Sequence, residues 1–252
     1  MRMLTLIMMI LVNLPAAWAS GNSAPLALVY RGPGTCWKGC AEAAAAVARA
    51  EGYRVRYVGP AETNQDIFTE ARLWIQPGGR AIEQAAAMAP PLKENIRHFV
   101  QGGGGYVGFC AGAFMASRQF GWEEKNGQRV TVDGLGLLPV RSRFYYREQH
   151  IAAMLPMRFP NGAQEYFYWE LGPYIDARQE ASGVEFLAFY PDQEDYYASA
   201  ARGRFGEGRV TVSAFHPEAP ALWRRIFGLK DPDGSDLNYA REMIRWAGDA
   251  RP

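Results

Sequence analysis

The chain has 252 residues, of which 48% are hydrophobic and 13% aromatic, and its formal net charge is +1. Because a near-neutral chain offers no broad basic surface for a polyanion, we do not expect nucleic acid as a partner. Beyond a short apolar leader, about 230 residues remain, which are enough for one substantial domain and too few for two. We therefore expect a single domain over residues 20–252.

Residues 1–19 have the pattern of a cleavable secretory signal peptide. They hold one charge, Arg2, followed by the apolar run Leu4–Val12 and by Ala17-Trp18-Ala19, which fits the small-x-small pattern of signal peptidase sites. An uncleaved anchor is the alternative, but the run is short of the ~20 residues needed to span a bilayer. We expect cleavage after Ala19 and a periplasmic or secreted protein without a stable membrane anchor. Loss of Arg2 leaves 26 basic and 26 acidic residues.

The first half of the remaining chain alternates short apolar strands with helices. The hydrophobic pattern predicts strands at Ala27–Tyr30, Tyr53–Val58, Leu73–Ile75 and Tyr106–Phe109. It predicts an alanine-rich helix at Cys40–Glu51 and helical sequence from Ile82 to Val100, broken at Pro90-Pro91. Strands separated by helices of this length favour a parallel sheet, in which ligands bind at the carboxyl ends of the strands.

The fourth strand ends in Gly108-Phe109-Cys110-Ala111-Gly112, the G-x-C-x-G form of a nucleophile elbow. A nucleophile at such a corner sits in a strained backbone conformation, and Gly108 and Gly112 let strand and helix pack closely around it. A buried small hydrophobe is the alternative interpretation of a cysteine in an apolar strand. If Cys110 is a nucleophile, it requires a histidine and a carboxylate elsewhere in the chain.

The second half is predicted to be richer in short strands and aromatic residues. Strand-like runs occur at Arg129–Val132, Leu137–Val140, Gln164–Trp169, Val184–Tyr190 and Tyr196–Ala201. They would form an antiparallel extension with walls above the site. Most of the aromatic side chains are expected to serve packing, but Tyr174 lies beside a turn and is the one expected to face a pocket.

The run Arg209–Ala214 predicts a late strand, and it is followed by Phe215-His216-Pro217-Glu218. Of the three histidines, only His216 has a carboxylate two residues further on. Glu218 can hydrogen-bond one ring nitrogen and leave the other to accept the thiol proton. A loop with a surface histidine is the alternative. Because both motifs follow strands, we favour a Cys110–His216–Glu218 triad; the chain then ends in a predicted structural helix, Leu237–Ala247.

The other two cysteines, Cys36 and Cys40, lie four residues apart in the turn after the first strand. In an oxidising compartment we expect them to form a disulfide, which leaves Cys110 as the odd thiol. A bridge from either of them to Cys110, as an oxidised resting form, is a second hypothesis. Their C-x3-C spacing matches neither a thioredoxin-like motif nor a zinc site, so we expect no metal and no cofactor.

These motifs together resemble the class I glutamine amidotransferase-like superfamily, in which an elbow cysteine and a late H-P-E supply a triad. The resemblance implies a three-layer α/β sandwich around a mostly parallel sheet, flavodoxin-like, with the antiparallel extension. It also implies that the Pro77-Gly78-Gly79 loop provides one oxyanion-hole amide, so Gly79 and Ala111 would donate their N–H groups to an oxyanion.

More narrowly, the chain resembles the biotin-protein-ligase N-terminal domain family, which includes free-standing bacterial proteins. The residues that carry this likeness are Leu28–Gly34, the Pro-Gly-Gly loop, the elbow, and Tyr168–Tyr174. The likeness implies a fold and a triad but no substrate and no biotin chemistry.

The sequence therefore predicts an exported cysteine hydrolase or amidase that acts on a small amide, ester or peptide bond, with a small molecule or peptide as its partner. The alternative is an exported ligand-binding or accessory module that retains the fold without turnover. A redox or carbonyl-stress role is weaker, because the branch of the superfamily with that role has a histidine where this chain has Ala111. Neither the substrate nor the oligomeric state follows from the sequence.

Overall fold

The computed structural model describes residues 24–123, 127–146, 151–178 and 182–249, so the leader expected at residues 1–19 lies outside the described residues. The elements in chain order are β1 (Leu26–Tyr30), α1 (Cys40–Ala50), β2 (Arg54–Val58), the 3-10 helix η1 (Gln65–Phe68), β3 (Ala71–Gln76), α2 (Ala81–Ala87), α3 (Pro90–Gln101), β4 (Gly105–Phe109), α4 (Ala111–Ala116), β5 (Ser117–Glu123), β6 (Arg129–Asp133), β7 (Leu138–Phe144), β8 (Ala152–Arg158), β9 (Gln164–Glu170), β10 (Pro173–Asp176), β11 (Val184–Phe189), β12 (Tyr197–Phe205), β13 (Gly208–Ser213), α5 (Ala221–Ile226) and α6 (Leu237–Gly248).

The strands of the described residues form one connected sheet, whose main path runs β2-β1-β3-β4-β13-β12-β10-β7-β5-β6. The segment from β2 to β13 is parallel throughout. Within it, Gln76 of β3 pairs with Gly108 of β4, and Phe109 of β4 pairs with Ser213 of β13. This register places the residues that follow β3, β4 and β13 at one edge of the sheet, which is where the three sequence motifs meet.

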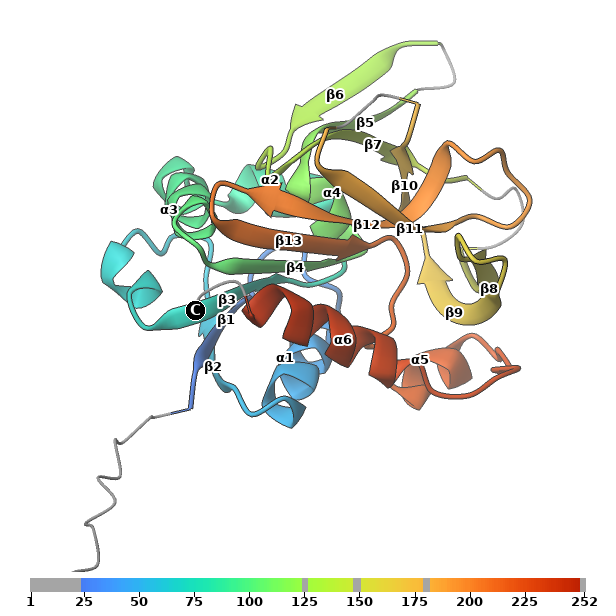
Figure 1. Cartoon of the computed structure of the whole chain (residues 1–252), viewed down its shortest axis with the longest axis horizontal. Coiled ribbons are helices and arrows are strands. Elements are labelled where there is room, and N and C mark those ends of the chain that lie inside the picture. The colour runs from blue at the N-terminus through green and yellow to red at the C-terminus, as the bar shows by residue number, and fades with distance from the viewer. Residues whose placement is uncertain (1–23, 124–126, 147–150, 179–181, 250–252) are drawn as a thin grey trace, which may run out of the picture.

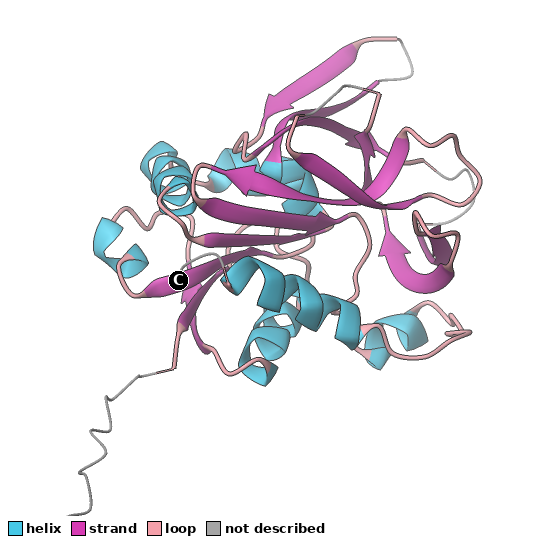
Figure 2. Ribbon diagram, viewed as in Figure 1, coloured by secondary structure: helices cyan, strands magenta, loops and turns pink. Residues whose placement is uncertain are grey.

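Helices cover both faces of the parallel part, as Figures 1 and 2 show. On one face, α2, α3 and α4 bury an apolar cluster that includes Trp74 and Tyr106. On the other face, α1 and α6 pack on Val29, Ile75 and Val107, with alanines of α1 allowing close approach to the strands. Alternate side chains of the same strands thus enter two different cores. The three-layer arrangement around a mostly parallel sheet, expected from the sequence, is confirmed.

The antiparallel extension begins beyond β13. β12 pairs antiparallel with both β13 and β10, and β10 pairs antiparallel with β7. The hairpin of β8 and β9 lies off the main path and joins it through β11. In Figure 1 this half of the molecule lies to the right, away from α3 and η1. The expected extension is therefore present.

Five elements were not anticipated from the sequence, namely the strands β5, β8 and β10, the helix α5 and the 3-10 helix η1. The helical sequence expected from Ile82 to Val100 is broken as predicted, but the break lies two residues earlier: α2 ends at Ala87 and α3 begins with Pro90, a position where the missing N–H is not needed. Over the described residues, no helix has the length and apolarity required to cross a membrane.

Candidate active site

Cys110 lies at the corner between β4 and α4 with φ 48° and ψ −98°, a left-handed conformation that is strained for a residue with a side chain. The glycines on either side make this corner possible. A Cβ at Gly108 would lie 2.6 Å from the backbone of Gly112, and a Cβ at Gly112 would lie 2.3 Å from the carbonyl oxygen of Gln76. The Cys110 amide donates a 2.7 Å hydrogen bond to the carbonyl of Ser213. The strained corner is thus fixed to β3, α4 and β13.

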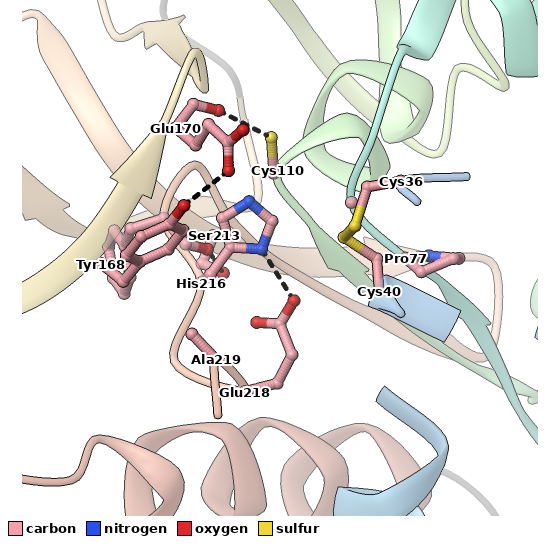
Figure 3. A network of polar contacts seen from close by, with 12 residues as sticks. Cys36, Cys40, Pro77, Cys110, Tyr168, Glu170, Ser213, His216, Glu218 and Ala219 are labelled. Carbon is pink, nitrogen blue, oxygen red and sulfur yellow. Dashed lines mark hydrogen bonds and ion pairs between the residues drawn. A yellow bond between two sulfur atoms is a disulfide. The ribbon is translucent and has the colours of Figure 1, made fainter. Parts of the chain in front are cut away.

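His216 and Glu218 lie directly beyond β13, next to this corner (Figure 3). The imidazole Nδ1 of His216 is 2.8 Å from Oε1 of Glu218, and both residues are buried. The Cys110 side chain lies beside the imidazole of His216 (Figure 3) and is one of the groups that raise the pKa of His216. The His216 amide donates a 2.8 Å bond to the carbonyl of Tyr168, which anchors the segment to β9. The structure thus brings together the three side chains of the predicted triad.

The charges around His216 favour its protonated form. Burial alone lowers the pKa of His216, but the nearby charges of Glu218 and Cys110, together with hydrogen bonds to both, raise the pKa to about 10. A neutral imidazole held between a carboxylate and a sulfur atom can take a proton from the sulfur, and the imidazolium so formed, stabilised by these neighbours, can later return it. The arrangement can therefore support nucleophilic chemistry at Cys110.

The Pro77-Gly78-Gly79 loop follows β3 and contacts His216. A Cβ at Gly78 would meet Cε1 of His216 at 2.3 Å, so glycine is required there. Gly79, with φ 136°, forms an isolated antiparallel bridge with Thr35. In this bridge the Cys36 amide donates to the carbonyl of Gly78 and the Arg80 amide donates to the carbonyl of Gly34. The Gly79 amide therefore takes no part in the hydrogen bonds of the bridge.

The Ala111 amide, at the first position of α4, likewise has no intrahelical acceptor. Among the backbone hydrogen bonds of the described residues neither amide has a partner outside α4, and the oxyanion-hole role of Gly79 and Ala111 remains a prediction.

A buried network of amide side chains holds the same loop. Gln76 accepts a 2.9 Å bond from Trp74 Nε1 and donates a 2.8 Å bond to Gln84 Oε1. Gln84 in turn donates to the carbonyls of Gly34, Pro77 and Gly78 at 3.2–3.4 Å. Because both glutamines are fully buried, each polar atom depends on these partners. The network ties the turn after β1 to the Pro77–Gly79 loop.

Cys36 and Cys40 form a disulfide at the start of α1, and Cys110 is free. The hypothesis of a bridge from Cys110 to either of them is therefore wrong for this structure. The reason is geometric: a Cα–Cα distance of 5.4 Å between Cys36 and Cys40 suits a disulfide within the turn. A Cβ at Gly78 would lie 3.3 Å from the Cys40 sulfur, so the disulfide lies against the loop.

Three polar residues at the site were not assigned from the sequence: Lys38, Tyr168 and Glu170. The Cys110 sulfur lies 3.6 Å from the carbonyl oxygen of Glu170. The Tyr168 hydroxyl donates a 2.7 Å bond to Oε2 of Glu170, and Lys38 forms an ion pair with the same oxygen. Lys38 also donates a 2.9 Å bond to the Tyr168 hydroxyl. The Tyr-Trp-Glu sequence at the end of β9 could have marked Tyr168 and Glu170 as candidate site residues. Only the fold shows that the end of β9 lies next to Cys110.

Tyr174, expected at the pocket, lies in β10 and is partly buried. Its ring packs against Tyr197 with centroids 4.5 Å apart, and burial raises the pKa of its hydroxyl. These contacts are those of a packing residue, and a pocket role for Tyr174 remains a prediction. Over the described ranges, no group of three or more His, Cys, Asp or Glu side chains is placed to hold a metal ion.

The chain has relatives of detectable similarity among curated proteins. An uncharacterized protein of Chlamydia muridarum is 26% identical over 156 residues, which cover 58% of this chain and 60% of that protein. The biotin--protein ligase of Schizosaccharomyces pombe is 22% identical over 217 residues, covering 71% of this chain but only 31% of the ligase. The chain thus spans less than two thirds of these curated relatives.

Among solved structures, a glutamine amidotransferase from Thermotoga maritima aligns over 90% of this chain and 95% of its own, with 13% identity and a TM-score of 0.47. The family model for the biotin-protein ligase N-terminal domain matches residues 26–231, a span that includes the elbow, the Pro-Gly-Gly loop and the His-Pro-Glu segment. The chain therefore belongs to the biotin-protein ligase N-terminal domain family.

Proposed function

We propose that this protein is a cysteine-dependent hydrolase or amidase that cleaves a small amide, ester or peptide bond. The observation that carries the proposal is that Cys110, His216 and the buried Glu218 lie side by side at a strained strand-to-helix corner, with Nδ1 of His216 2.8 Å from Oε1 of Glu218 (Figure 3). Strain at a corner that three neighbouring segments fix in place is typical of functional positions.

In the proposed reaction, His216 takes the thiol proton and the Cys110 sulfur attacks the substrate carbonyl carbon. The Gly79 and Ala111 amides would hold the negative charge that develops on the carbonyl oxygen. The bond to the leaving amine or alcohol breaks, and His216 returns its proton to that group. Water then attacks the resulting thioester with His216 as the base, which releases a carboxylic acid and frees Cys110. Glu218 orients His216 throughout.

We also propose that the protein is exported. The pattern of residues 1–19 favours a cleavable signal peptide. The Cys36–Cys40 disulfide is consistent with an oxidising compartment, since disulfides persist there and are rare in the cytosol.

Alkylation of Cys110 by iodoacetamide, followed by mass spectrometry without reductant, tests the proposed triad. We expect rapid labelling that is absent in Cys110→Ala and slower by on the order of 10²-fold in His216→Ala, because the proton acceptor is lost. His98→Ala is the matched control, since His98 is an exposed histidine on α3, and it should label like the wild type.

Wild-type labelling no faster than that of the denatured chain, or equal rates in His216→Ala and the wild type, would contradict an assembled triad. Such a result would favour the ligand-binding module instead. Rapid labelling would justify a screen of amides, esters and peptides for turnover.

A further inference from the structure

The carboxylate of Glu170 is the charged side chain that the fold holds next to Cys110 without burying it. The backbone carbonyl oxygen of Glu170 lies 3.6 Å from the Cys110 sulfur, and 26% of the Glu170 side chain is exposed. In Figure 3 the carboxylate lies between the Tyr168 hydroxyl and Cys110, above the ring of His216.

The position of Glu170 is fixed by its neighbours in the chain. Leu171 has φ 49°, a strained conformation for a residue with a side chain, so the chain turns sharply after Glu170. Gly172 then packs directly on the segment that leads to His216, because a Cβ there would lie 1.8 Å from the carbonyl oxygen of Ala214. A strained residue persists only where the surrounding structure holds it. We conclude that the turn serves to place Glu170.

The partner of Glu170 is hidden from solvent. Only 2% of the Lys38 side chain is exposed, and its ammonium lies 4.8–5.3 Å from the ring centroids of Tyr168, Trp223 and Phe227. Lys38 and Tyr168 both bind the same carboxylate oxygen, Oε2. The two partners of this ion pair therefore differ in exposure: the ammonium of Lys38 is buried behind aromatic rings, whereas the carboxylate of Glu170 is partly exposed to solvent.

The charges of the site add to this asymmetry. Cys110 and His216 are neutral together whether the proton is on sulfur or on the imidazole, whereas Glu218 and Glu170 are two carboxylates against the single ammonium of Lys38. A negative excess favours cationic ligands and disfavours anionic ones. Because Lys38 is enclosed by the rings, it is not available to pair with a substrate carboxylate.

We propose that Glu170 is a specificity-determining residue that selects substrates carrying a primary ammonium group close to the carbonyl attacked by Cys110. Its second oxygen, Oε1, accepts a hydrogen bond from that ammonium, while Lys38 and Tyr168 hold Oε2. Substrates with a carboxylate at the same position are rejected. This inference rests on the proposed hydrolase function, since it names the substrate class of the same site.

Three thiol reagents that differ in charge test the inference without requiring turnover. They are methyl methanethiosulfonate and its 2-aminoethyl and 2-sulfonatoethyl analogues, which are neutral, cationic and anionic, respectively. Cys110 is the free thiol of the chain, so the rate of mass increase reports on this site alone. In the wild type we expect the cationic reagent to react faster than the anionic one by on the order of tenfold, after correction for their rates with a free thiol.

In Glu170→Gln the ratio of cationic to anionic rates should fall to near one, because the carboxylate charge is removed. Since that variant leaves Lys38 buried without its carboxylate, the double variant Lys38→Met/Glu170→Gln is the second measurement. It keeps the net charge of the site, so a ratio that still falls below the wild-type value shows that the exposed carboxylate itself, rather than the net charge, carries the preference. Glu185→Gln is the matched control, because Glu185 forms an exposed ion pair with Arg202, and it should keep the wild-type ratio.

The outcomes separate the two proposals. Slow reaction of Cys110 with all three reagents, but with the charge preference present and lost in Glu170→Gln, would contradict the hydrolase and keep the ligand preference. Rapid reaction with a ratio near one in the wild type, or with the same ratio in Glu170→Gln, would overturn the inference about Glu170 and keep the hydrolase. No reaction with any reagent would contradict both.

Discussion

His216 is buried, and the charges of its neighbours, rather than solvent, stabilise its imidazolium. Burial opposes protonation, yet Glu218 and Cys110 raise the pKa of His216 to about 10 from an ordinary value of 6.5. A group whose pKa is higher in the folded protein than in the unfolded chain stabilises the folded protein. This stabilisation is complete at pH values below the pKa of the unfolded chain, and it is lost as the pH rises through the pKa of the folded protein.

We therefore expect the free energy of unfolding to decline between about pH 6.5 and pH 10 more steeply in the wild type than in His216→Gln. Urea unfolding midpoints at pH 6, 8 and 10 measure this difference. The comparison is of how steeply the free energy of unfolding changes with pH in each protein. The absolute free energies are not compared, because a glutamine at this buried position itself changes the stability. Parallel slopes would show that His216 does not hold a proton more tightly when folded.

The three predicted triad residues could be picked out because each stands in a local motif at the end of a predicted strand. Cys110 has its two glycines, and Glu218 is two residues from His216. Lys38 and Glu170 could not be paired in this way, since they are separated by 132 residues and only the fold brings them together. An ion pair of this kind depends on how β9 docks against the turn before α1.

The loop after β3 fits against His216 with no space for an added methyl group. The residue that shows this is Gly78, where a Cβ would overlap the imidazole. Gly59, in the turn after β2, has nothing within 4 Å of the same position.

We expect Gly78→Ala to displace His216, to slow alkylation of Cys110 strongly and to destabilise the protein by about 1–3 kcal/mol, as overpacking usually does. Gly59→Ala should label normally and unfold at the wild-type midpoint. Iodoacetamide kinetics and urea unfolding measure the two effects. Normal labelling in Gly78→Ala would mean that the loop moves away from His216 at little cost.

The parallel strands were predictable because apolar runs alternate with helices, whereas several later elements give no such signal. Strand β5 follows α4 directly at Ser117, with no turn residue to mark the change. Strand β8 contains Pro156, which argues against a strand in sequence but is tolerated in a hairpin near the edge of a sheet. Strand β10 has four residues and begins with Pro173. These elements form because tertiary pairing outweighs local preference.

The C-terminal segment is joined to the rest of the molecule by a buried arginine. Arg224 of α5 donates a 2.9 Å bond to the carbonyl of Ala219, the residue after Glu218. It also forms ion pairs with Asp231 at 2.7 Å and with Asp236 at 2.9 Å. Burial raises the pKa of Asp236 to about 8, although the charge of Arg224 opposes that rise. Arg224 thus connects the His-Pro-Glu segment to the start of α6.

Replacing Arg224 with methionine should destabilise the protein by about 3 kcal/mol or more, because two poorly solvated carboxylates lose their cation. Arg225→Met is the matched control, since Arg225 is the next residue of α5 and is exposed, and its effect should stay within about 0.5 kcal/mol. Chemical denaturation of both variants measures this. Equal midpoints for the two variants would mean that solvent reaches Asp231 and Asp236 readily.

The junction between the two parts of the sheet also bears on how the family can diversify. Cys110 and His216 follow strands of the parallel part, whereas Glu170 belongs to the β8–β9 hairpin. Within the described part of the chain, this hairpin pairs with the remaining sheet through one residue pair, Phe189 with Arg158. Mutations in that hairpin can alter what approaches the sulfur while the strands that carry Cys110 and His216 remain unchanged. Because the backbone of β9 at Tyr168 also holds His216, we expect such changes to be confined to side chains of the hairpin such as Glu170.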